Sequence, residues 1–208
     1  MSPDDGGINN VKIGVLALQG DFAEHVQMLG KLGVQAVEVR LPRDMADIDG
    51  LIIPGGESTT IGKLSVAFGL MAPIRQFGLK KPIWGTCAGA IFLAKESRHD
   101  QPMLKLMDIV VLRNAFGRQV DSFKTHLEIP AIITPENRGP FHAVFIRAPL
   151  IEQAGPDVEI LARLADGRIV AARQDYFLAT SFHPELTGDD RFHRYFVQMT
   201  LNSKGMSK

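Results

Sequence analysis

Apolar residues along this chain fall into short runs separated by segments of helical spacing. The first run, residues 11–20 (VKIGVLALQG), is almost wholly apolar and ends at Gly20, which is typical of a strand buried on both faces of a parallel sheet. Asp21 then predicts the N-cap of a helix, with Glu24 at the capping-box position and apolar residues at helical spacing after it. The pattern therefore predicts a buried strand followed by an amphipathic helix.

The same alternation continues through the first half of the chain. Residues 34–41 predict a more exposed strand, whereas residues 50–54 and 81–86 predict short buried strands. Apolar residues recur at loosely helical spacing over residues 60–77, and a further helix is expected to begin near Ala88. Because strands that alternate with helices usually pair in parallel, the fold class should be α/β, a three-layer α/β/α sandwich with a mostly parallel central sheet.

The second half of the chain is mostly extended. Asp166 and Gly167 lie between two of its extended segments and form a hairpin signal, because both tolerate the positive φ of a tight turn. An antiparallel portion should therefore extend the parallel sheet. Residues 189–204 predict a closing amphipathic helix. Its apolar side should carry Phe192, Phe196 and Met199.

Composition is ordinary for a folded globular protein. The 208 residues are 45% hydrophobic and 22% charged, which suffices for one domain with a sizeable core. We expect that domain over residues 11–204, with a flexible N-terminal tail over residues 1–10. The tail is polar and lacks the basic start and apolar stretch of a signal peptide.

The charge balance and the cysteine count limit the kinds of binding partner and the cellular compartment expected for this chain. Lys+Arg and Asp+Glu number 23 each, so the balance favours neither nucleic acid nor an anionic membrane surface as a partner. No run approaches the roughly 18 uncharged apolar residues that a membrane helix needs. A single cysteine forms no internal disulfide, so a reduced, cytoplasmic location is expected.

The one cysteine, Cys87, lies in the sequence GTCAG over residues 85–89. A Gly-x-Cys-x-Gly pattern between a strand and a helix is typical of a nucleophile elbow, where small neighbours admit the sharp turn. The N-terminus of the following helix favours a thiolate, and its N–H groups can form an oxyanion hole. The alternative is a small buried hydrophobe, which is how most free cysteines behave. The strand-turn-helix context favours the nucleophile.

A thiolate nucleophile needs a base, and His183 in TSFHPE is the best candidate. It ends an apolar strand, and Glu185, two residues on, should project to the same side in extended geometry and orient the imidazole. An isolated histidine at a strand end would otherwise be exposed. The other histidines lack this combination of a strand end and an orienting carboxylate. They are His25, His99, His126, His142 and His193. His193 should lie on a charged helix face.

The segment PGGESTT, residues 54–60, follows a predicted buried strand. Its adjacent glycines let N–H groups converge on a carbonyl or carboxylate oxygen, and Ser58 and Thr59 could cap the next helix. It lacks the GxxxxGK[ST] spacing of a phosphate-binding loop, so nucleotide binding is not expected. The alternative is a plain strand-to-helix loop.

Together, GTCAG, PGGES and SFHPE resemble the class I (triad) glutamine amidotransferases. Longer segments are similar to the glutaminase subunits of pyridoxal 5'-phosphate synthases, and the similarity runs from Val11 to the closing helix. The segments are LALQGDFAEH, LIIPGGESTT, RNAFGRQVDSF, VFIRAP and FLATSFHPELT. The resemblance implies a class I glutamine amidotransferase-like, flavodoxin-like fold.

The resemblance also implies roles for individual residues. Cys87 is the expected nucleophile, His183 the general base and acid, and Glu185 the orienting carboxylate. The residues expected to bind L-glutamine are Gly56, Glu57, Ser58, Arg113, Ile146 and Arg147. Those expected in the oxyanion hole or an activation loop are Gln19, Gly20, Gly55 and Ala88. The loop at Gln19 is expected to change backbone orientation when a partner docks. No metal and no organic cofactor are expected.

The function implied is hydrolysis of L-glutamine to glutamate and ammonia. The ammonia would pass to a separate synthase subunit, which combines it with a pentose phosphate and glyceraldehyde 3-phosphate to make pyridoxal 5'-phosphate. The glutaminase would be weak or silent alone.

Three other functions remain open. A class I glutaminase could serve another acceptor, for example in histidine biosynthesis, although RNAFGRQVDSF disfavours it. A non-catalytic protein could use Cys87 as a redox-sensing thiol, although it would need neither His183 nor Glu185. A free-standing cysteine hydrolase would be active without a partner.

Overall fold

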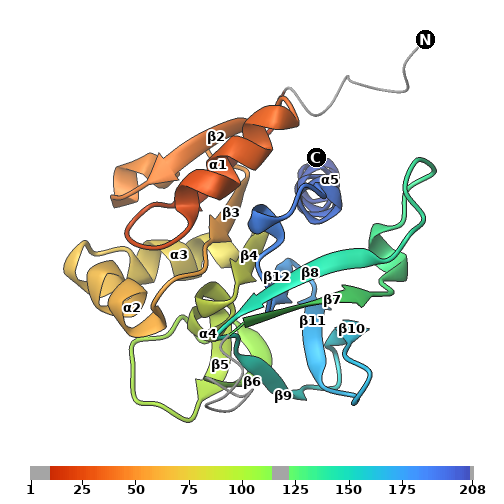
Figure 1. Cartoon of the computed structure of the whole chain (residues 1–208). Helices are drawn as coiled ribbons and strands as arrows, with labels where there is room; N and C mark the ends of the chain where they lie inside the picture. Colours follow the sequence, from red (N-terminus) through yellow and green to blue (C-terminus); the bar gives the residue numbers. More distant parts are fainter. Residues whose placement is uncertain (1–9, 114–121, 207–208) are drawn as a thin grey trace.

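The computed structural model describes residues 10–113 and 122–206. Residues 1–9 of the predicted tail, and residues 114–121 of the segment RNAFGRQVDSF, lie outside these ranges. A mixed ten-stranded sheet runs through the molecule, with a separate two-stranded sheet beside it (Figure 1).

Five strands pair in parallel in the order β2-β1-β3-β4-β12, and four of them come from the first half of the chain. Their bounds are β1 Lys12–Leu16, β2 Gln35–Val39, β3 Gly50–Ile53, β4 Ile83–Thr86 and β12 Phe177–Thr180. The predicted parallel sheet is therefore present, and β2 is its more exposed edge strand, as expected.

The sheet continues beyond β12 through antiparallel pairs, as the sequence predicted. These strands are β11 Ile169–Gln174, β10 Glu159–Arg163, β9 Leu150–Ala154 and β6 Met107–Leu112, and β5 Ala94–Ser97 then pairs in parallel with β6. The turn at Asp166 and Gly167 joins β10 to β11, and Gly167 has a φ of 88°. The predicted hairpin is thus confirmed.

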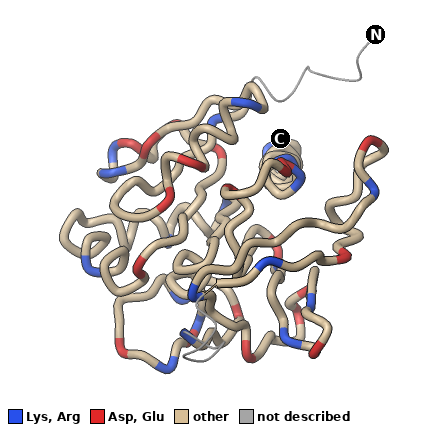
Figure 2. Tube along the Cα trace, viewed as in Figure 1, with Lys and Arg blue, Asp and Glu red and all other residues tan. Residues whose placement is uncertain are grey.

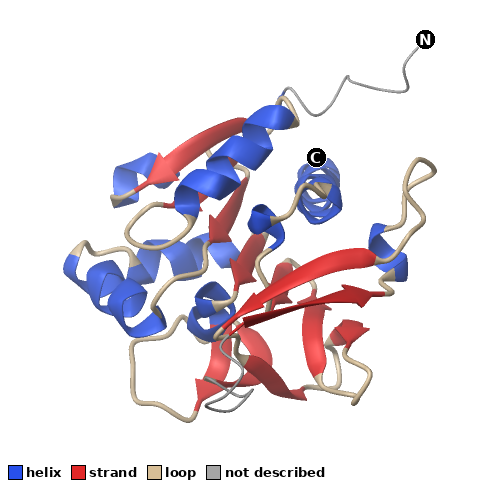
Figure 3. Ribbon diagram, in the orientation of Figure 1, coloured by secondary structure: helices blue, strands red, loops and turns tan. Residues whose placement is uncertain are grey.

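Helices cover both faces of the sheet, which gives the three layers (Figure 3). The helices α2 Ser58–Ala67, α3 Met71–Gly78 and α4 Ala88–Leu93 pack on one face, and α1 Phe22–Lys31 and α5 Arg191–Met206 pack on the other. Side chains of β3 alternate between the two cores, with Leu51 and Ile53 on one side and Ile52 on the other. This alternation follows the pleat of a strand buried on both faces.

Two details of the predicted elements are wrong. The long helix over residues 60–77 is two helices that separate at Gly69, where φ is 68° and the N–H groups of Gly69 and Leu70 bond back to carbonyls of α2. A glycine in this conformation ends a helix rather than continuing it. The first strand also ends at Leu16, so residues 17–21 form a loop.

The predicted helix caps are confirmed only in part, because Asp21 holds the N-cap position of α1. The side chain of Asp21 makes no cap hydrogen bond at α1. At α2 the cap is Glu57 rather than Ser58 or Thr59, because its carboxylate accepts bonds from the N–H groups of Thr59 and Thr60. A carboxylate at a helix N-terminus is also favoured by the helix dipole.

A hairpin of β7 Ser122–Leu127 and β8 Phe141–Ile146 forms the second sheet. It contacts the segment that follows β12, since the N–H of His183 donates to the carbonyl of Val144 at 2.8 Å. The Cys87 sulfur lies 3.9 Å from the carbonyl oxygen of Ile146. The hairpin therefore contacts both residues expected to carry the chemistry.

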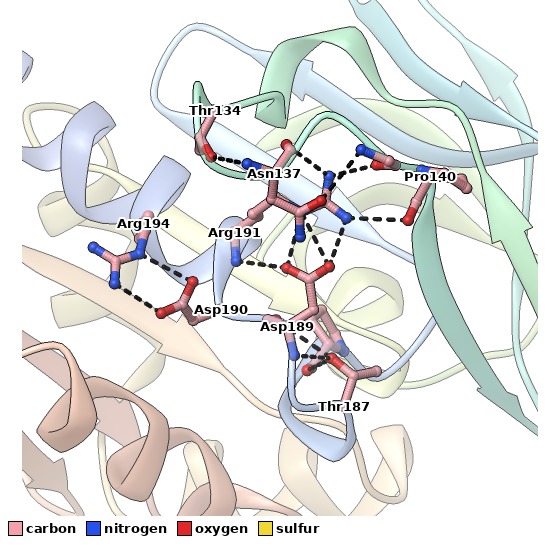
Figure 4. A network of polar contacts seen from close by, with 10 residues as sticks. Thr134, Asn137, Pro140, Thr187, Asp189, Asp190, Arg191 and Arg194 are labelled. Atoms are coloured by element: carbon pink, nitrogen blue, oxygen red, sulfur yellow. Dashed lines mark hydrogen bonds and ion pairs between the residues drawn. The ribbon is translucent and has the colours of Figure 1, made fainter.

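A buried arginine joins the start of α5 to the connection between β7 and β8 (Figure 4). Arg191 pairs with Asp189, with one nitrogen-to-oxygen distance of 2.6 Å, and donates to the carbonyls of Gly139 and Pro140 at 2.7 and 3.1 Å. Its side chain is 4% exposed. By contrast, Arg194 of α5 pairs with Asp190, which immediately precedes that helix, and both side chains are more exposed.

We expect Arg191→Met to lower the free energy of unfolding by about 3 kcal/mol, because it leaves Asp189 and several carbonyls partly buried without a donor. Arg194→Met is the matched control and should lower it by less than about 1 kcal/mol. Urea denaturation measures both values. Equal losses for the two variants would contradict this interpretation.

Charged positions of both signs are interspersed over the trace (Figure 2). No helix within residues 10–113 and 122–206 combines the length and apolar character needed to cross a bilayer.

Candidate active site

Cys87 lies in the turn between β4 and α4, where the sequence predicted a nucleophile elbow. Its φ is 48° and its ψ is −106°, and its N–H donates to the carbonyl of Thr180 at 2.8 Å. A Cβ atom at Gly89 would lie 2.0 Å from the carbonyl oxygen of Ile53, so only glycine lets α4 approach β3 this closely. Ala88 is the first residue of α4. The predicted elbow geometry is therefore present.

His183 follows β12 and lies beside Glu185, with 2.7 Å between His183 Nδ1 and Glu185 Oε1. The expected extended geometry is wrong, because Pro184–Leu186 forms a short 3-10 helix, η4. This turn still brings the carboxylate to the imidazole. Both side chains are buried, at 4% and 0% exposure.

The Cys87 sulfur lies close enough to His183 to act on the pKa of its imidazole, and Glu185 bonds to the same ring. Burial alone would lower the pKa of His183, but bonds with Asp21, Cys87 and Glu185 outweigh it and raise that pKa to about 12. Burial raises the pKa of Glu185, and its bond to His183 opposes that change.

Asp21 is a site residue that sequence reasoning missed. Instead of making a cap hydrogen bond at α1, its carboxylate lies 3.3 Å from His183 Nδ1. The loop that carries it folds onto PGGES, because the N–H of Asp21 donates to the carbonyl of Gly55 at 3.0 Å. Gly20 has a φ of 96°, and a Cβ there would lie 1.8 Å from that same carbonyl oxygen. Only the loop's tertiary position identifies Asp21.

Asp21, His183 and Glu185 place potential ligand atoms within 4.8 Å of one another, a grouping of three that could hold a metal ion. His183 Nδ1 is already engaged by both carboxylates, at 2.7 and 3.3 Å. A proton on that nitrogen accounts for the grouping, so we assign no metal role to it.

The PGGES segment carries Glu57, which pairs with Arg113 at 2.8 Å. Burial opposes its ionisation, but bonds from Thr60 and Thr59 and the charge of Arg113 lower the pKa of Glu57 to about 2. Ser58 is buried and donates to Gln101. The two charged residues expected to bind the ends of glutamine therefore neutralise each other here.

Gln19 lies across this segment. Its amide oxygen accepts a bond from the N–H of Glu57 at 2.8 Å and would lie 2.6 Å from a Cβ at Gly56. A Cβ at Gly55 would lie 2.4 Å from Cε1 of His183. The expected activation loop thus touches the glycine pair beside the base.

Ile146 and Arg147 lie at the end of β8. The carbonyl oxygen of Ile146 faces the Cys87 sulfur at 3.9 Å. Arg147 is exposed and has a φ of 41°, which is uncommon for a residue other than glycine. The structure brings the expected site residues into one region around β4, β8 and β12.

The prediction for His193 is wrong, since its side chain is fully buried rather than on a charged helix face. His25 is equally buried and lies 3.0 Å from it between ring nitrogens. His99, His126 and His142 are exposed.

Comparisons with known proteins agree with this architecture. Residues 15–202 match the model of the SNO glutamine amidotransferase family. A protein of Dehalococcoides mccartyi named pyridoxal 5'-phosphate synthase subunit PdxT is 58% identical over 198 residues, covering 93% of this chain and 100% of its own. One of the same name from Herpetosiphon aurantiacus is 60% identical over 190 residues, covering 89% and 98%.

A solved structure described as a glutamine amidotransferase has a TM-score of 0.83 and 50% identity, and the match covers 90% of this chain and 98% of that one. The chain belongs to the SNO glutamine amidotransferase family.

Proposed function

We propose that the chain hydrolyses L-glutamine to glutamate and ammonia with a triad of Cys87, His183 and Glu185, as the glutaminase subunit of a pyridoxal 5'-phosphate synthase. The observation that carries the proposal is the meeting of the elbow and the base: Cys87 bonds through its N–H to Thr180 at the end of β12, just before His183, and His183 Nδ1 lies 2.7 Å from Glu185 Oε1. A nucleophile, a base and an orienting carboxylate in that order are the parts that acyl transfer needs.

The reaction proceeds in two halves. The Cys87 thiolate attacks the side-chain amide carbon of glutamine, and N–H groups at the start of α4 stabilise the oxyanion. The C–N bond breaks as His183 gives a proton to the leaving nitrogen, which departs as ammonia. Water, deprotonated by His183, then attacks the thioester, the S–C bond breaks, and glutamate leaves.

The charges of Glu57 and Arg113 suit the two ends of the substrate. A carboxylate can bind the α-ammonium of glutamine and a guanidinium its α-carboxylate. Since the two side chains pair with each other at 2.8 Å, glutamine exchanges partners with an existing ion pair. We assign Gly56, Ser58, Ile146 and Arg147 to the remaining contacts.

A separate synthase subunit is the proposed partner. The chain spans 98–100% of relatives that are named pyridoxal 5'-phosphate synthase subunits, and we assign the same role to it. Ammonia is useful only where an acceptor consumes it, and the synthase would combine it with a pentose phosphate and glyceraldehyde 3-phosphate. We assign the reaction to the cytoplasm, in keeping with the free thiol of Cys87.

The loop at Gln19 and Gly20 is the proposed link to that partner. It contacts the glycine pair of PGGES through the N–H of Glu57 and the carbonyl of Gly55. A change in its backbone would alter the N–H groups available near the scissile amide. Docking of the synthase is therefore proposed to set the glutaminase rate.

The deciding experiment measures glutamate and ammonia release from L-glutamine by the chain alone and with the synthase subunit. We expect slow release alone and a sharp rise with the synthase. No release in either condition would favour a non-catalytic or redox-sensing protein. Full activity without the synthase would favour a free-standing hydrolase, and activation only by another acceptor enzyme would reassign the pathway.

A further inference from the structure

Two buried histidines lie behind the carboxylate of the proposed triad. His25, on α1, places Nε2 3.3 Å from Glu185 Oε2, and its Nδ1 lies 3.0 Å from Nε2 of His193 on α5. The side chains of His25 and Glu185 are fully buried, as is residue His193. A line of ring nitrogens and carboxylate oxygens therefore continues from His183 through Glu185 into the core.

The carboxylate of Glu185 needs a donor on each oxygen, because a buried anion without hydrogen bonds is costly. His183 supplies one to Oε1 at 2.7 Å. Oε2 has no partner that meets hydrogen-bond geometry within the described residues, and the ring nitrogen of His25 is the group that faces it. Whether that nitrogen carries a proton therefore decides how well the anion is held.

The contacts select one tautomer for each histidine. A bare His25 Nε2 would direct its lone pair at an anionic oxygen, so the proton belongs on that nitrogen, which bonds with Thr86 Oγ1 and faces Glu185 Oε2, each at 3.3 Å. Nδ1 of His25 is then an acceptor, and His193 must donate from Nε2. His193 Nδ1 is left as a bare acceptor, which agrees with its lack of a partner within residues 10–113 and 122–206.

Both rings are neutral in this arrangement. Burial, with His193 and His183 nearby, holds the pKa of His25 well below its ordinary value, and burial lowers that of His193 to about 3. Trp84 fixes both rings edge-on, with centroids 5.6 Å from His25 and 5.0 Å from His193. Near neutral pH, neither ring gains a proton, so the contacts alone set the two tautomers.

We propose that His25 is a positioning residue of the glutaminase reaction, which presents a protonated Nε2 to Glu185 Oε2 at 3.3 Å while His193 holds it in that tautomer. The inference rests on the proposed function. With His183 bonded to Oε1 and the N–H of His25 facing Oε2, the carboxylate keeps one orientation toward His183 Nδ1, and the imidazolium that forms during catalysis is stabilised. His25 acts only through Glu185 and touches no substrate.

The test compares His25→Leu with His25→Gln in the complex with the synthase. Leucine removes the donor, whereas the amide nitrogen of glutamine can replace Nε2. We expect His25→Leu to lower kcat about 10–100-fold with little change in KM, as for outer-shell partners elsewhere, and His25→Gln to recover most of the rate. Thr200→Val, which removes a different buried hydrogen bond in α5, controls for lost stability.

The pH dependence of kcat/KM distinguishes a positioning role of His25 from a purely structural role. The charged or titratable groups that face His183 are Asp21, Glu185 and Cys87, and those that face Glu185 are His183, His25 and Asp21. If His25 supports the carboxylate, His25→Leu weakens the imidazolium of His183 and moves the alkaline limb of kcat/KM to lower pH. A structural role would lower activity without moving that limb, and would overturn the inference.

Nitrogen-15 chemical shifts of the imidazoles test the tautomers without activity. We expect His25 and His193 as neutral Nε2–H forms in the wild-type chain. A protonated Nδ1 on either ring overturns the inference even if His25→Leu does not fold. A wild-type complex that releases no ammonia refutes the proposed function, whereas an active wild type with equally active His25→Leu refutes only this inference.

Discussion

Cys87→Ala is expected to lower kcat for glutamine hydrolysis by about four orders of magnitude or more, because no other group in the proposed triad can form the thioester. Any residual rate would come from binding and the oxyanion hole alone. Glutamate release in the presence of the synthase measures the effect. Association with the synthase should persist, because Cys87 is only 6% exposed and alanine removes a single sulfur atom.

Cys87→Ser tests whether Cys87 is needed as a nucleophile or only as a packed side chain. Serine keeps the size of the side chain but lacks a thiolate, so it should be nearly as inactive as alanine. A serine variant with substantial activity, or an alanine variant with an unchanged rate, would contradict the role of Cys87.

Glu185→Gln is expected to lower kcat by about 10³–10⁴-fold, because a neutral amide neither stabilises the imidazolium nor fixes its tautomer. Glu152→Gln is the matched control, since Glu152 lies on β9 and forms a different ion pair, with Arg98 at 2.6 Å. That control should retain the wild-type rate. Comparable losses in the two variants would refute an orienting role for Glu185.

The same variant should change the titration of His183. The pKa of about 12 exceeds the ordinary value of 6.5, so the charged imidazole stabilises the fold most fully below pH 6.5 and loses this contribution as pH rises toward 12. In Glu185→Gln, His183 should titrate at lower pH, and the stability difference from wild type should shrink as pH rises. Imidazole NMR and urea denaturation measure the two effects.

Groups close together in the sequence were predictable. The elbow at residues 85–89 depends on neighbouring glycines, and the contact between His183 and Glu185 spans two positions, so both leave a local pattern. The parallel half of the sheet was predictable for the same reason, since each strand and helix has its own periodicity. The predicted single domain and the roles of the site residues remain predictions.

Residues joined by tertiary packing were not predictable. His25 and His193 meet although they are 168 positions apart, and nothing in either local segment indicates a buried pair. Asp21 has the expected position of a helix cap, but its loop folds onto Gly55 and delivers the carboxylate to His183. Local propensity was outweighed by a contact available only in the folded chain.

The split of the predicted long helix did leave a signal in the sequence. Phe68-Gly69-Leu70 has a glycine followed by a large apolar residue, the pattern of a helix that ends in a left-handed residue. The loosely helical spacing across it concealed the break. The cap at Glu57 was not predictable for another reason. Ser58 and Thr59 are the better intrinsic caps, and the pairing of Glu57 with Arg113 forms only in the folded chain.

The backbone of Cys87 has a φ of 48° and a ψ of −106°. At this position the residue that catalysis needs is not the residue that gives the most stable fold. A residue with a Cβ held in such a sparsely populated conformation destabilises the native state by roughly 1–3 kcal/mol, whereas glycine adopts it freely. Glycine at this position would give a more stable and inactive protein. Optimising this chain for thermal stability alone would therefore select against its own nucleophile, and position 87 must be held fixed in any such design.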